Sequence, residues 1–254
     1  MLTPWLDDFY SHEKKLNKPW SFFMLKFMNI TVLSGAGMSA GSGLSTFRDN
    51  DGLWNKHNVY DVATPEAWER NQKLVLQFYN ERRKQLKNVE PNEGHLEIAK
   101  WQNHFNVQVI TQNVDNLHER AGSKHILHLH GELVKSRSTG PSGKTFTISD
   151  DTLENGDLCP DGYQLRPHVV WFGEDVPAMD DALKIVSKTD VLVIVGTSLN
   201  VYPAAGLAFR ASSNCPIYVV DPKEIDNAPN NAIHLKEKAI SGLKKLTSIF
   251  LQTT

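Results

Sequence analysis

The sequence lacks several features that mark large classes of proteins. Only two cysteines, Cys159 and Cys215, occur in 254 residues, so the chain alone can build neither a disulfide framework nor a zinc site of four cysteines. No apolar run approaches the roughly 20 residues that a membrane-spanning helix needs, and the mixed-charge start does not resemble a secretory signal. A basic surplus is also absent, because 27 lysines and arginines stand against 29 aspartates and glutamates. We therefore expect a cytoplasmic monomer with no nucleic-acid and no membrane partner.

Short apolar runs alternate with helical patterns along the chain. The runs are mostly four or five residues long, and their nearly continuous apolar character indicates strands buried on both faces. They are Ile30–Leu33, Val107–Ile110, Ile126–His130, Val169–Phe172, Val191–Val195 and Ile217–Val220. Between them, Glu66–Lys87 and Asn92–Asn103 have the apolar spacing of helices, and an Asn cap would open the second. This order predicts an α/β fold with a doubly wound, Rossmann-like parallel sheet.

Two segments interrupt the alternation and predict a small, discontinuous second domain. Residues 51–91 would form a helical insertion, and the polar stretch 135–165 would form a small lobe of hairpins and loops. The remaining segments would be a Rossmann-like domain over 26–50, 92–134 and 166–254, and an N-terminal extension over 1–25.

Small polar residues follow most of the predicted strands. In open parallel sheets, ligands bind beyond the carboxyl ends of the strands, so we expect these residues to share one crevice. They are Gly35, Gln112, Asn113, His130, Gly196, Ser198 and Asp221. The alternative is that they are ordinary loop residues, which are commonly small and polar.

The turn after the first strand fits the dinucleotide-binding pattern G-x-G-x-x-G/A. Residues 35–40 read GAGMSA, and such glycines allow a tight turn and a close approach to a pyrophosphate, which helix N–H groups then face. A tight strand–helix turn without a ligand is the alternative. The chain continues as a long loop with Phe47 and Arg48 instead of a second strand ending in an acidic residue. This departure argues against ordinary hydride transfer.

Five motifs in order resemble the sirtuins, which are NAD⁺-dependent protein-lysine deacylases. They extend from near Ile30 to the C-terminal helix. The motifs are GAGMSAGSGLSTFR (Gly35–Arg48), TQNVDNLHERAG (Thr111–Gly122), LHG (Leu129–Gly131), RPHVVWFGE (Arg166–Glu174) and GTSLNVYPAAG (Gly196–Gly206). The segment FYNERRKQL (Phe78–Leu86) further resembles the bacterial and mitochondrial-type branch that accepts acidic acyl groups.

The resemblance implies a reaction and its catalytic residues. The carbonyl oxygen of an acyl-lysine protein or peptide displaces nicotinamide from the ribose C1′ of NAD⁺, and the products are nicotinamide, free lysine and O-acyl-ADP-ribose. His130 would be the general base on a ribose hydroxyl, a role that suits a pKa near neutrality. Asn113 would order a water or ribose hydroxyl. A hydrogen-bonded structural histidine is the alternative for His130, and we expect His125 and His128 to be structural or surface residues without a metal, since no acidic or cysteine partner is evident nearby.

The resemblance also assigns the NAD⁺-binding residues position by position. Phe47 would shield the reactive ribose, Arg48 would stay close to the phosphates, and Asp115 would accept a hydrogen bond from the nicotinamide amide, with a helix N-cap as its alternative role. The pyrophosphate and ribose region would be lined by Gly35, Ala36, Gly37, Met38 and Ser39, the nicotinamide pocket by Gln112, Asn113, Val114 and Asp115, and the adenosine end by Gly196, Thr197, Ser198, Asp221 and Ala239.

An acyl-lysine peptide would bind between two strand edges by β-augmentation. The edge residues would be Val170, Phe172, Gly173 and Glu174 on one side and Val201 on the other. Tyr79 and Arg82 lie three residues apart, so they share a helix face. A guanidinium binds a carboxylate bidentately and a phenol adds one hydrogen bond, so this pair would select succinyl, malonyl or glutaryl over acetyl. From spacing alone, the alternative is a solvent-facing arginine in a basic run.

The small lobe departs from the family pattern. Most sirtuins bind zinc through two cysteine pairs, whereas Ser138 stands at one expected position and only Cys159 remains of the second pair. We therefore expect no zinc. Either packing through Phe146, Ile148, Leu153, Leu158 and Tyr163 would then stabilise the lobe, or the lobe would be loosely ordered. Two other functions stay open: ADP-ribosyl transfer or NAD⁺ hydrolysis, and a non-catalytic NAD⁺ or ADP-ribose sensor that would not need His130.

Overall fold

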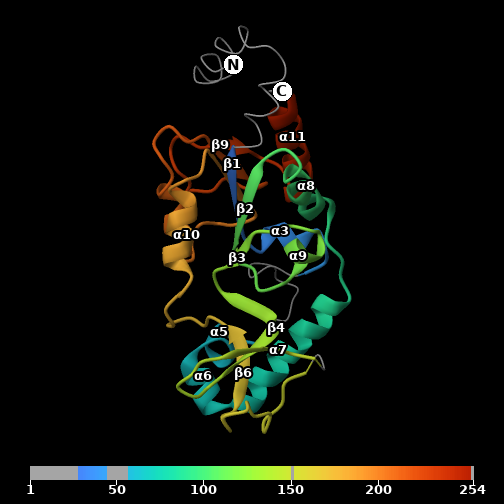
Figure 1. The fold of residues 1–254 in the computed structure, drawn as a ribbon, viewed down its shortest axis with the longest axis vertical. Helices are drawn as coiled ribbons and strands as arrows, with labels where there is room; N and C mark the ends of the chain where they lie inside the picture. The colour runs from blue at the N-terminus through green and yellow to red at the C-terminus, as the bar shows by residue number, and fades with distance from the viewer. Residues whose placement is uncertain (1–27, 45–56, 150–151, 253–254) are drawn as a thin grey trace.

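A six-stranded parallel sheet forms the larger part of the molecule (Figure 1). The computed structural model describes residues 28–44, 57–149 and 152–252. The strand order is β3-β2-β1-β7-β8-β9, and every neighbouring pair is parallel. The order runs outward in both directions from β1 and β7, so the predicted doubly wound sheet is confirmed. The strands are β1 (Asn29–Ser34), β2 (Asn106–Thr111), β3 (Ile126–His128), β7 (Val191–Val195), β8 (Ile217–Val220) and β9 (Ile233–Leu235).

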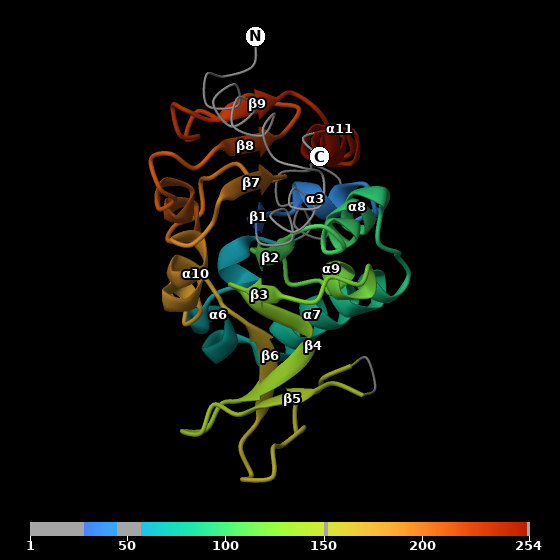
Figure 2. The ribbon, with the colours of Figure 1, turned by 45° about the horizontal axis from the view of Figure 1, so that its top comes forward.

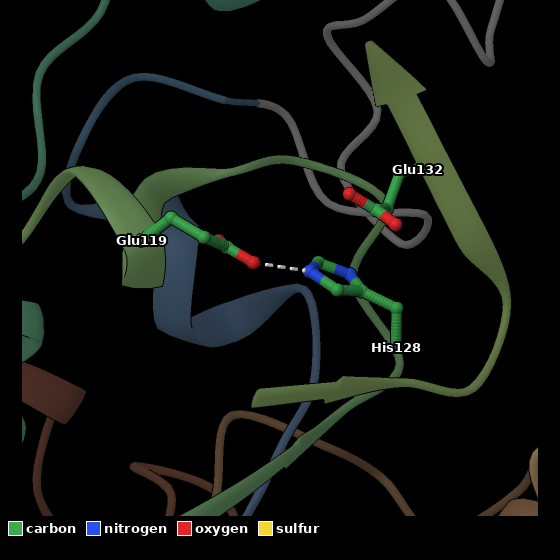
Figure 3. A group of neighbouring side chains, drawn as sticks. All are labelled: Glu119, His128 and Glu132. Carbon is green, nitrogen blue, oxygen red and sulfur yellow. Dashed lines mark hydrogen bonds and ion pairs between the residues drawn. The ribbon is translucent and has the colours of Figure 1, made fainter. Parts of the chain in front are cut away.

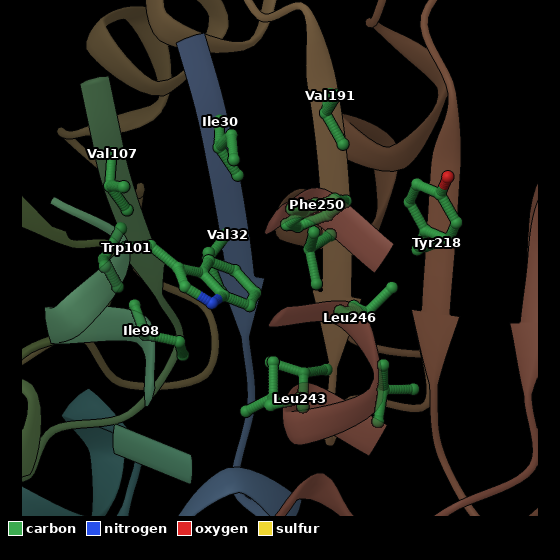
Figure 4. Close-up of a cluster of buried hydrophobic side chains, with 14 of the residues drawn as sticks. Ile30, Val32, Ile98, Trp101, Val107, Val191, Tyr218, Leu243, Leu246 and Phe250 are labelled. Carbon is green, nitrogen blue, oxygen red and sulfur yellow. The ribbon is translucent and has the colours of Figure 1, made fainter. Parts of the chain in front are cut away.

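Helices cover both faces of this sheet (Figure 1). Successive side chains of a strand point to opposite faces, so Val191, Val193 and Val195 of β7 pack beneath α8 (Glu93–Trp101) and α11 (Ala239–Gln252). Leu192 and Ile194 face α10 (Met179–Val186) and the 3₁₀ helix η1 (Ala204–Phe209). Figure 4 shows the first of these clusters, with Trp101 and Phe250 facing the strands. A strand buried on both faces needs an unbroken apolar run, which is why the sequence pattern locates β7 correctly.

A three-stranded antiparallel sheet forms the second domain, at the end of the molecule opposite β9 and α11 (Figures 1 and 2). Its order is β5-β4-β6, and three helices lie beside it. Phe78 and Tyr79 from one of these helices pack with Leu133 and Trp171 in a third buried cluster. The elements are α5 (Val59–Val62), α6 (Pro65–Arg70), α7 (Gln72–Lys87), β4 (Gly131–Ser138), β5 (Thr145–Thr147) and β6 (Leu165–Val169). The exact residues at which one domain ends and the other begins, as given in the sequence analysis, stay a prediction.

The structure corrects two predicted elements. The helix predicted over Glu66–Lys87 is two helices, because the side chain of Asn71 accepts the Leu74 N–H (3.1 Å) and starts α7 anew. The strand predicted over Val169–Phe172 is wrong, because β6 ends at Val169 and belongs to the second sheet. The predicted Asn cap of α8 is confirmed, with the Asn92 side chain accepting the Gly94 N–H at 2.9 Å.

Hydrogen bonds hold the lobe at Ser138 and Cys159, the positions that the resemblance relates to zinc-binding cysteines. Ser138 Oγ lies 3.3 Å from Cys159 Sγ. The Gln164 side chain accepts the Gly156 N–H (2.7 Å) and donates to nearby backbone carbonyls. Of the five residues predicted to pack the lobe, Leu153 is buried, and Phe146 and Ile148 are partly buried. Tyr163 is 46% exposed but its ring packs against Gly140, whereas Leu158 is 56% exposed. The absence of zinc stays a prediction.

Among the residues described, no helix combines the length and the apolar character that crossing a bilayer requires.

Candidate active site

The glycine turn sits where the strand order reverses, between β1 and β7. Gly35 donates its N–H to the Val195 carbonyl (3.0 Å), and Gly37 donates to the Gly196 carbonyl (2.8 Å). A Cβ at Gly196, whose φ is +62°, would lie 2.3 Å from the Met38 nitrogen. The glycines are therefore needed because two stretches of backbone touch at this point. This edge of the sheet is the place where open α/β folds bind ligands.

The N–H groups at the start of helix α3 (Gly37–Ala40) already form hydrogen bonds with the turn before the helix. Met38 and Ser39 donate theirs to the carbonyls of Gly35 and Ala36, at 2.9 and 3.0 Å. Within the described ranges, the N–H of Ala36 forms no such bond, so the anion contact predicted from the glycine pattern falls on Ala36. Phe47 and Arg48 lie outside the described residues.

A buried polar network joins the glycine turn to the loop after β2. The Asn113 side-chain amide donates to the Gly35 carbonyl and to Ser39 Oγ, both at 3.1 Å. Ser39 donates in turn to Asp115 Oδ2 (2.9 Å), while Asp115 Oδ1 accepts the Leu117 N–H (3.2 Å) at the start of α9 (Leu117–Arg120). The N-cap of α9 is Asn116, so the alternative role of Asp115 as the N-cap is wrong: Asp115 precedes the cap and accepts the N–H two residues further on. Burial raises the pKa of Asp115.

Three successive carbonyls of this loop are held by the segment 128–133, which comprises the end of β3, the link after it and the start of β4. His130 Nδ1 lies 3.0 Å from the Gln112 carbonyl oxygen, and His128 Nδ1 lies 3.0 Å from that of Asn113. The Val114 carbonyl accepts the Leu133 N–H at 2.7 Å. Two of these three contacts depend on histidine side chains. The loop predicted to line the nicotinamide pocket is therefore fixed by the same segment that carries the predicted base.

The two histidines differ at their second ring nitrogen. Nε2 of His128 lies 2.7 Å from Glu119 Oε1, whereas Nε2 of His130 is hydrogen-bonded to none of the described residues. Burial lowers the pKa of His130, so its ring is neutral near pH 7 with the proton on Nδ1 and a lone pair on Nε2. These are the properties of a general base. His128 has no free lone pair of this kind.

The expectation that no acidic partner lies near His128 is wrong. Glu119 and Glu132 flank it (Figure 3), and ligand atoms of the three side chains lie within 4.8 Å of one another. The loop before α9 and the turn into β4 bring both carboxylates to the ring. Sequence spacing gave no signal for this contact with Glu119.

Tyr79 and Arg82 lie together on the inner face of α7. The Tyr79 hydroxyl accepts the Trp171 indole N–H (3.0 Å), and burial raises the pKa of Tyr79 to about 12. Burial lowers the pKa of Arg82, while the nearby Tyr79 and Asp115 partly offset this effect. Arg82 is half-buried, and its guanidinium lies 5.8 Å from the centre of the Phe78 ring, so it is not the solvent-facing arginine of the alternative interpretation.

Glu174 has a different position from the one that its place in the motif suggests. Its carboxylate forms ion pairs with Arg137 and Arg166, both at 2.8 Å, and accepts the Trp171 N–H at 2.8 Å. The Arg166 guanidinium in turn lies 3.6 Å from the centre of the Trp171 ring. Glu174 therefore fixes the position of Trp171, both through the Trp171 N–H and through Arg166. Sequence reasoning gave no role to Arg137, Arg166 or Trp171, although Arg166 and Trp171 lie in the same motif as Glu174.

The predicted peptide-binding edges are only partly available. The N–H groups of Val170 and Phe172 already donate to the carbonyls of His130 (2.9 Å) and Ala63 (3.0 Å). The side chains of Phe172 and Val201 are 45% and 38% exposed, and Gly173 lies in a turn at φ +92°.

The adenosine-end residues lie along the ends of β7 and β8. The Thr197 hydroxyl accepts a hydrogen bond from the Gln112 amide (3.0 Å), and Ser198 follows it, partly buried. The Asp221 carboxylate accepts the Lys223 N–H (2.9 Å) in the turn after β8. Ala239, the first residue of α11, is partly buried against the sheet. The described hydrogen bonds do not join Asp221 or Ala239 to the Asn113 network.

Comparison with known proteins shows the family to which this chain belongs. A model of the Sir2 family matches residues 35–203, which include the glycine turn, His130 and Gly196. The chain belongs to the Sir2 family. An NAD-dependent protein deacylase of Bacteroides thetaiotaomicron is 51% identical to it over 229 residues, which cover 88% of this chain and 98% of that protein.

Solved Sir2 structures share the fold. A crystal structure of a Sir2 homologue with NAD is 36% identical, with a TM-score of 0.78 over 88% of this chain and 90% of that chain. A mutant Sir2 homologue in complex with ADP-ribose is 33% identical, with a TM-score of 0.81 over 93% and 97% of the two chains. The expected combination of a Rossmann-like domain and a small second domain is thus confirmed.

The buried polar side chains of this Sir2 chain fit a dinucleotide, which offers both hydrogen-bond donors and acceptors. Beside the buried network of Asn113, Ser39 and Asp115, the side-chain oxygen of Asn116 is buried and has no hydrogen-bond partner among the described residues. A buried acceptor left unpaired costs about 1–3 kcal/mol, so an N–H donor on a ligand would stabilise this position. Sequence reasoning missed Asn116, although it lies within the matched motif.

Proposed function

We propose that the chain is an NAD⁺-dependent protein-lysine deacylase that accepts acidic acyl groups as well as acetyl. Its Sir2 membership and the named activity of a relative at 51% identity support the reaction class. The observation that carries the proposal is the state of His130. Its Nδ1 is held at 3.0 Å by the carbonyl of Gln112, the residue before Asn113 of the Asn113–Ser39–Asp115 network, and its Nε2 is hydrogen-bonded to none of the described residues.

The residues of the site divide the work of the reaction. NAD⁺, when bound, supplies a ribose carbon whose bond to nicotinamide breaks. Nε2 of His130 takes the proton of a ribose hydroxyl, and the Gln112 carbonyl stabilises the positive charge that the ring then carries. Asn113 and Asp115, fixed through Ser39, orient the nicotinamide and its ribose. The glycine turn with Ala36, Met38, Phe47 and Arg48 would hold the phosphates, and Thr197, Ser198, Asp221 and Ala239 would hold the adenosine.

Tyr79 and Arg82 support the choice of acyl group. Both side chains lie on the inner face of α7, and the charge of Arg82 acts on both Tyr79 and Asp115. The acyl chain would therefore end beside a guanidinium and a phenol while its amide lies near the ribose. A carboxylate at the end of a succinyl or malonyl group would pair with Arg82 and accept the Tyr79 O–H.

The experiment measures the mass of matched succinyl- and acetyl-lysine peptides, with and without NAD⁺. Deacylation that requires NAD⁺ and yields O-acyl-ADP-ribose supports the proposal. His130→Ala should reduce turnover by about 10²–10⁴-fold, the usual contribution of a general base, without preventing NAD⁺ binding measured by calorimetry. NAD⁺ binding with no turnover of any peptide by the wild-type protein would instead indicate the sensor function.

A further inference from the structure

His128 has no role in the reaction as described, yet it is tightly bound. Its side chain is only 8% exposed. Nδ1 lies 3.0 Å from the Asn113 carbonyl oxygen and Nε2 lies 2.7 Å from Glu119 Oε1, so both ring nitrogens face acceptors. A neutral imidazole can donate only one of these two hydrogen bonds. Both contacts are satisfied together only when the ring is protonated.

The charged groups around His128 favour this protonated ring. Glu119 of α9 and Glu132 of β4 flank it (Figure 3), Asp115 lies in the adjoining loop, and Lys135 of β4 pairs with Glu132 at 2.7 Å. The nearby His118 adds no charge, because burial keeps its pKa well below the ordinary value. Burial alone would lower the pKa of His128, but Glu119, the Asn113 carbonyl and Glu132 together raise it.

We propose that His128 is a positioning residue for the reaction: as an imidazolium paired with Glu119, it fixes the Asn113 carbonyl and thereby the loop 112–115 beside His130. The inference rests on the proposed deacylase function. The network forms only when the side-chain amide of Asn113 points at Ser39. The backbone carbonyl of Asn113, which His128 contacts, fixes the orientation of the peptide bond between Asn113 and Val114 and so constrains the loop. His128 and His130 thus hold the carbonyls of two adjacent residues, but the His128 ring is protonated and the His130 ring is neutral.

A pH effect follows from this arrangement. When the His128 ring loses its proton, the Nε2 lone pair faces the Glu119 carboxylate, and the repulsion releases the ring and the Asn113 carbonyl. Because the pKa is raised, the contact is fully present below the ordinary pKa of a histidine and is lost as the pH rises through the raised value. At low pH, activity falls because His130 becomes protonated. The two histidines therefore predict a bell-shaped profile of kcat/KM against pH.

The test compares pH profiles of kcat/KM for the wild type, His128→Gln, Glu119→Gln and the control His125→Gln, which changes an exposed histidine three residues away. Glu119→Gln should move the alkaline limb to lower pH by about one unit and leave the acid limb in place. His128→Gln should lower kcat/KM about 10–100-fold at neutral pH and remove the alkaline limb, while His125→Gln behaves like the wild type. An alkaline limb that Glu119→Gln does not move would overturn the proposal. So would activation by a divalent metal that a chelator reverses, since it would make the three side chains a metal site.

A second measurement is independent of turnover. Nitrogen-15 NMR of the histidine rings should show both nitrogens of His128 protonated at pH 7 in the wild type, and should show this state lost at lower pH in Glu119→Gln than in the wild type. A neutral His128 ring at pH 7 in the folded wild type would refute the proposal even if the enzyme is active. If the wild type consumes no NAD⁺ with any acyl-peptide, the proposed function fails, and the NMR result still decides the state of His128.

Discussion

Replacing Arg82 by methionine removes the guanidinium from the inner face of α7 while keeping a side chain of similar length. Arg82 lies beside Tyr79, whose hydroxyl is fixed by the Trp171 indole at 3.0 Å, so the pair is preorganised for a carboxylate. A bidentate contact comprises two charge-assisted hydrogen bonds, each worth about 1.5–3 kcal/mol. Taking the lower value for each, about 3 kcal/mol of binding to the succinyl group is lost.

That loss corresponds to a decrease in kcat/KM of about 100-fold for a succinyl-lysine peptide. An acetyl group carries no carboxylate, so we expect its kcat/KM to stay within about threefold of the wild-type value. The assay measures both peptides, identical in sequence, with the same enzyme preparation. Lys84→Met is the matched control, because it removes one positive charge from an exposed position of the same helix. Equal losses on the two peptides would refute the reasoning about acyl selectivity.

Three further predictions address stability and composition. Gly196→Ala should lower Tm by about 6–12 °C, from a cost of about 3 kcal/mol, because the new Cβ meets the Met38 nitrogen at 2.3 Å. The control Gly206→Ala, whose Cβ has nothing within 4 Å, should leave Tm unchanged. An unchanged Tm in Gly196→Ala would show that the two turns can separate without cost. Burial opposes the charge on Glu174, but its bonds to Arg166 and to the Trp171 N–H hold its pKa below the ordinary value, so its stabilisation is present at neutral pH and is lost as the pH falls through the lowered pKa. Urea unfolding should therefore separate Glu174→Gln from the wild type at pH 7 and much less near pH 3, with the exposed Glu69→Gln as control; an equal difference at both pH values would contradict the ion-pair account. Elemental analysis of the purified protein should find no stoichiometric zinc, and chelation should not change Tm; one zinc per chain would contradict the assignment of Ser138 and Cys159 to a hydrogen-bonded pair at 3.3 Å.

The sequence located the parts of the fold that depend on local pattern. Strands such as β7 are buried on both faces, and an unbroken run such as VLVIV follows directly from that burial. The same logic failed for Val169–Phe172. Its apolar residues are divided between the end of β6, a buried Trp171 and an exposed Phe172, so an apolar run there has no single cause.

The candidate site was predictable where motifs end neighbouring strands of the parallel sheet. Gly35, Asn113 and Asp115 lie in two such motifs, and the doubly wound topology brings the two together. The supporting contacts were not predictable, since most of them join side chains from segments that share no motif. The hydrogen bond from Trp171 to Tyr79 spans 92 residues. Such pairs depend on how α7 packs against the segment after β6 within the second domain, and periodicity carries no information about that.

The most direct test of the account is the ratio of nicotinamide released to lysine freed, measured by chromatography during turnover of NAD⁺ with a succinyl-lysine peptide. The account predicts one nicotinamide and one O-acyl-ADP-ribose for each lysine, and no nicotinamide release when the peptide is omitted. Nicotinamide released at the same rate without peptide, or lysine freed without NAD⁺, would contradict it.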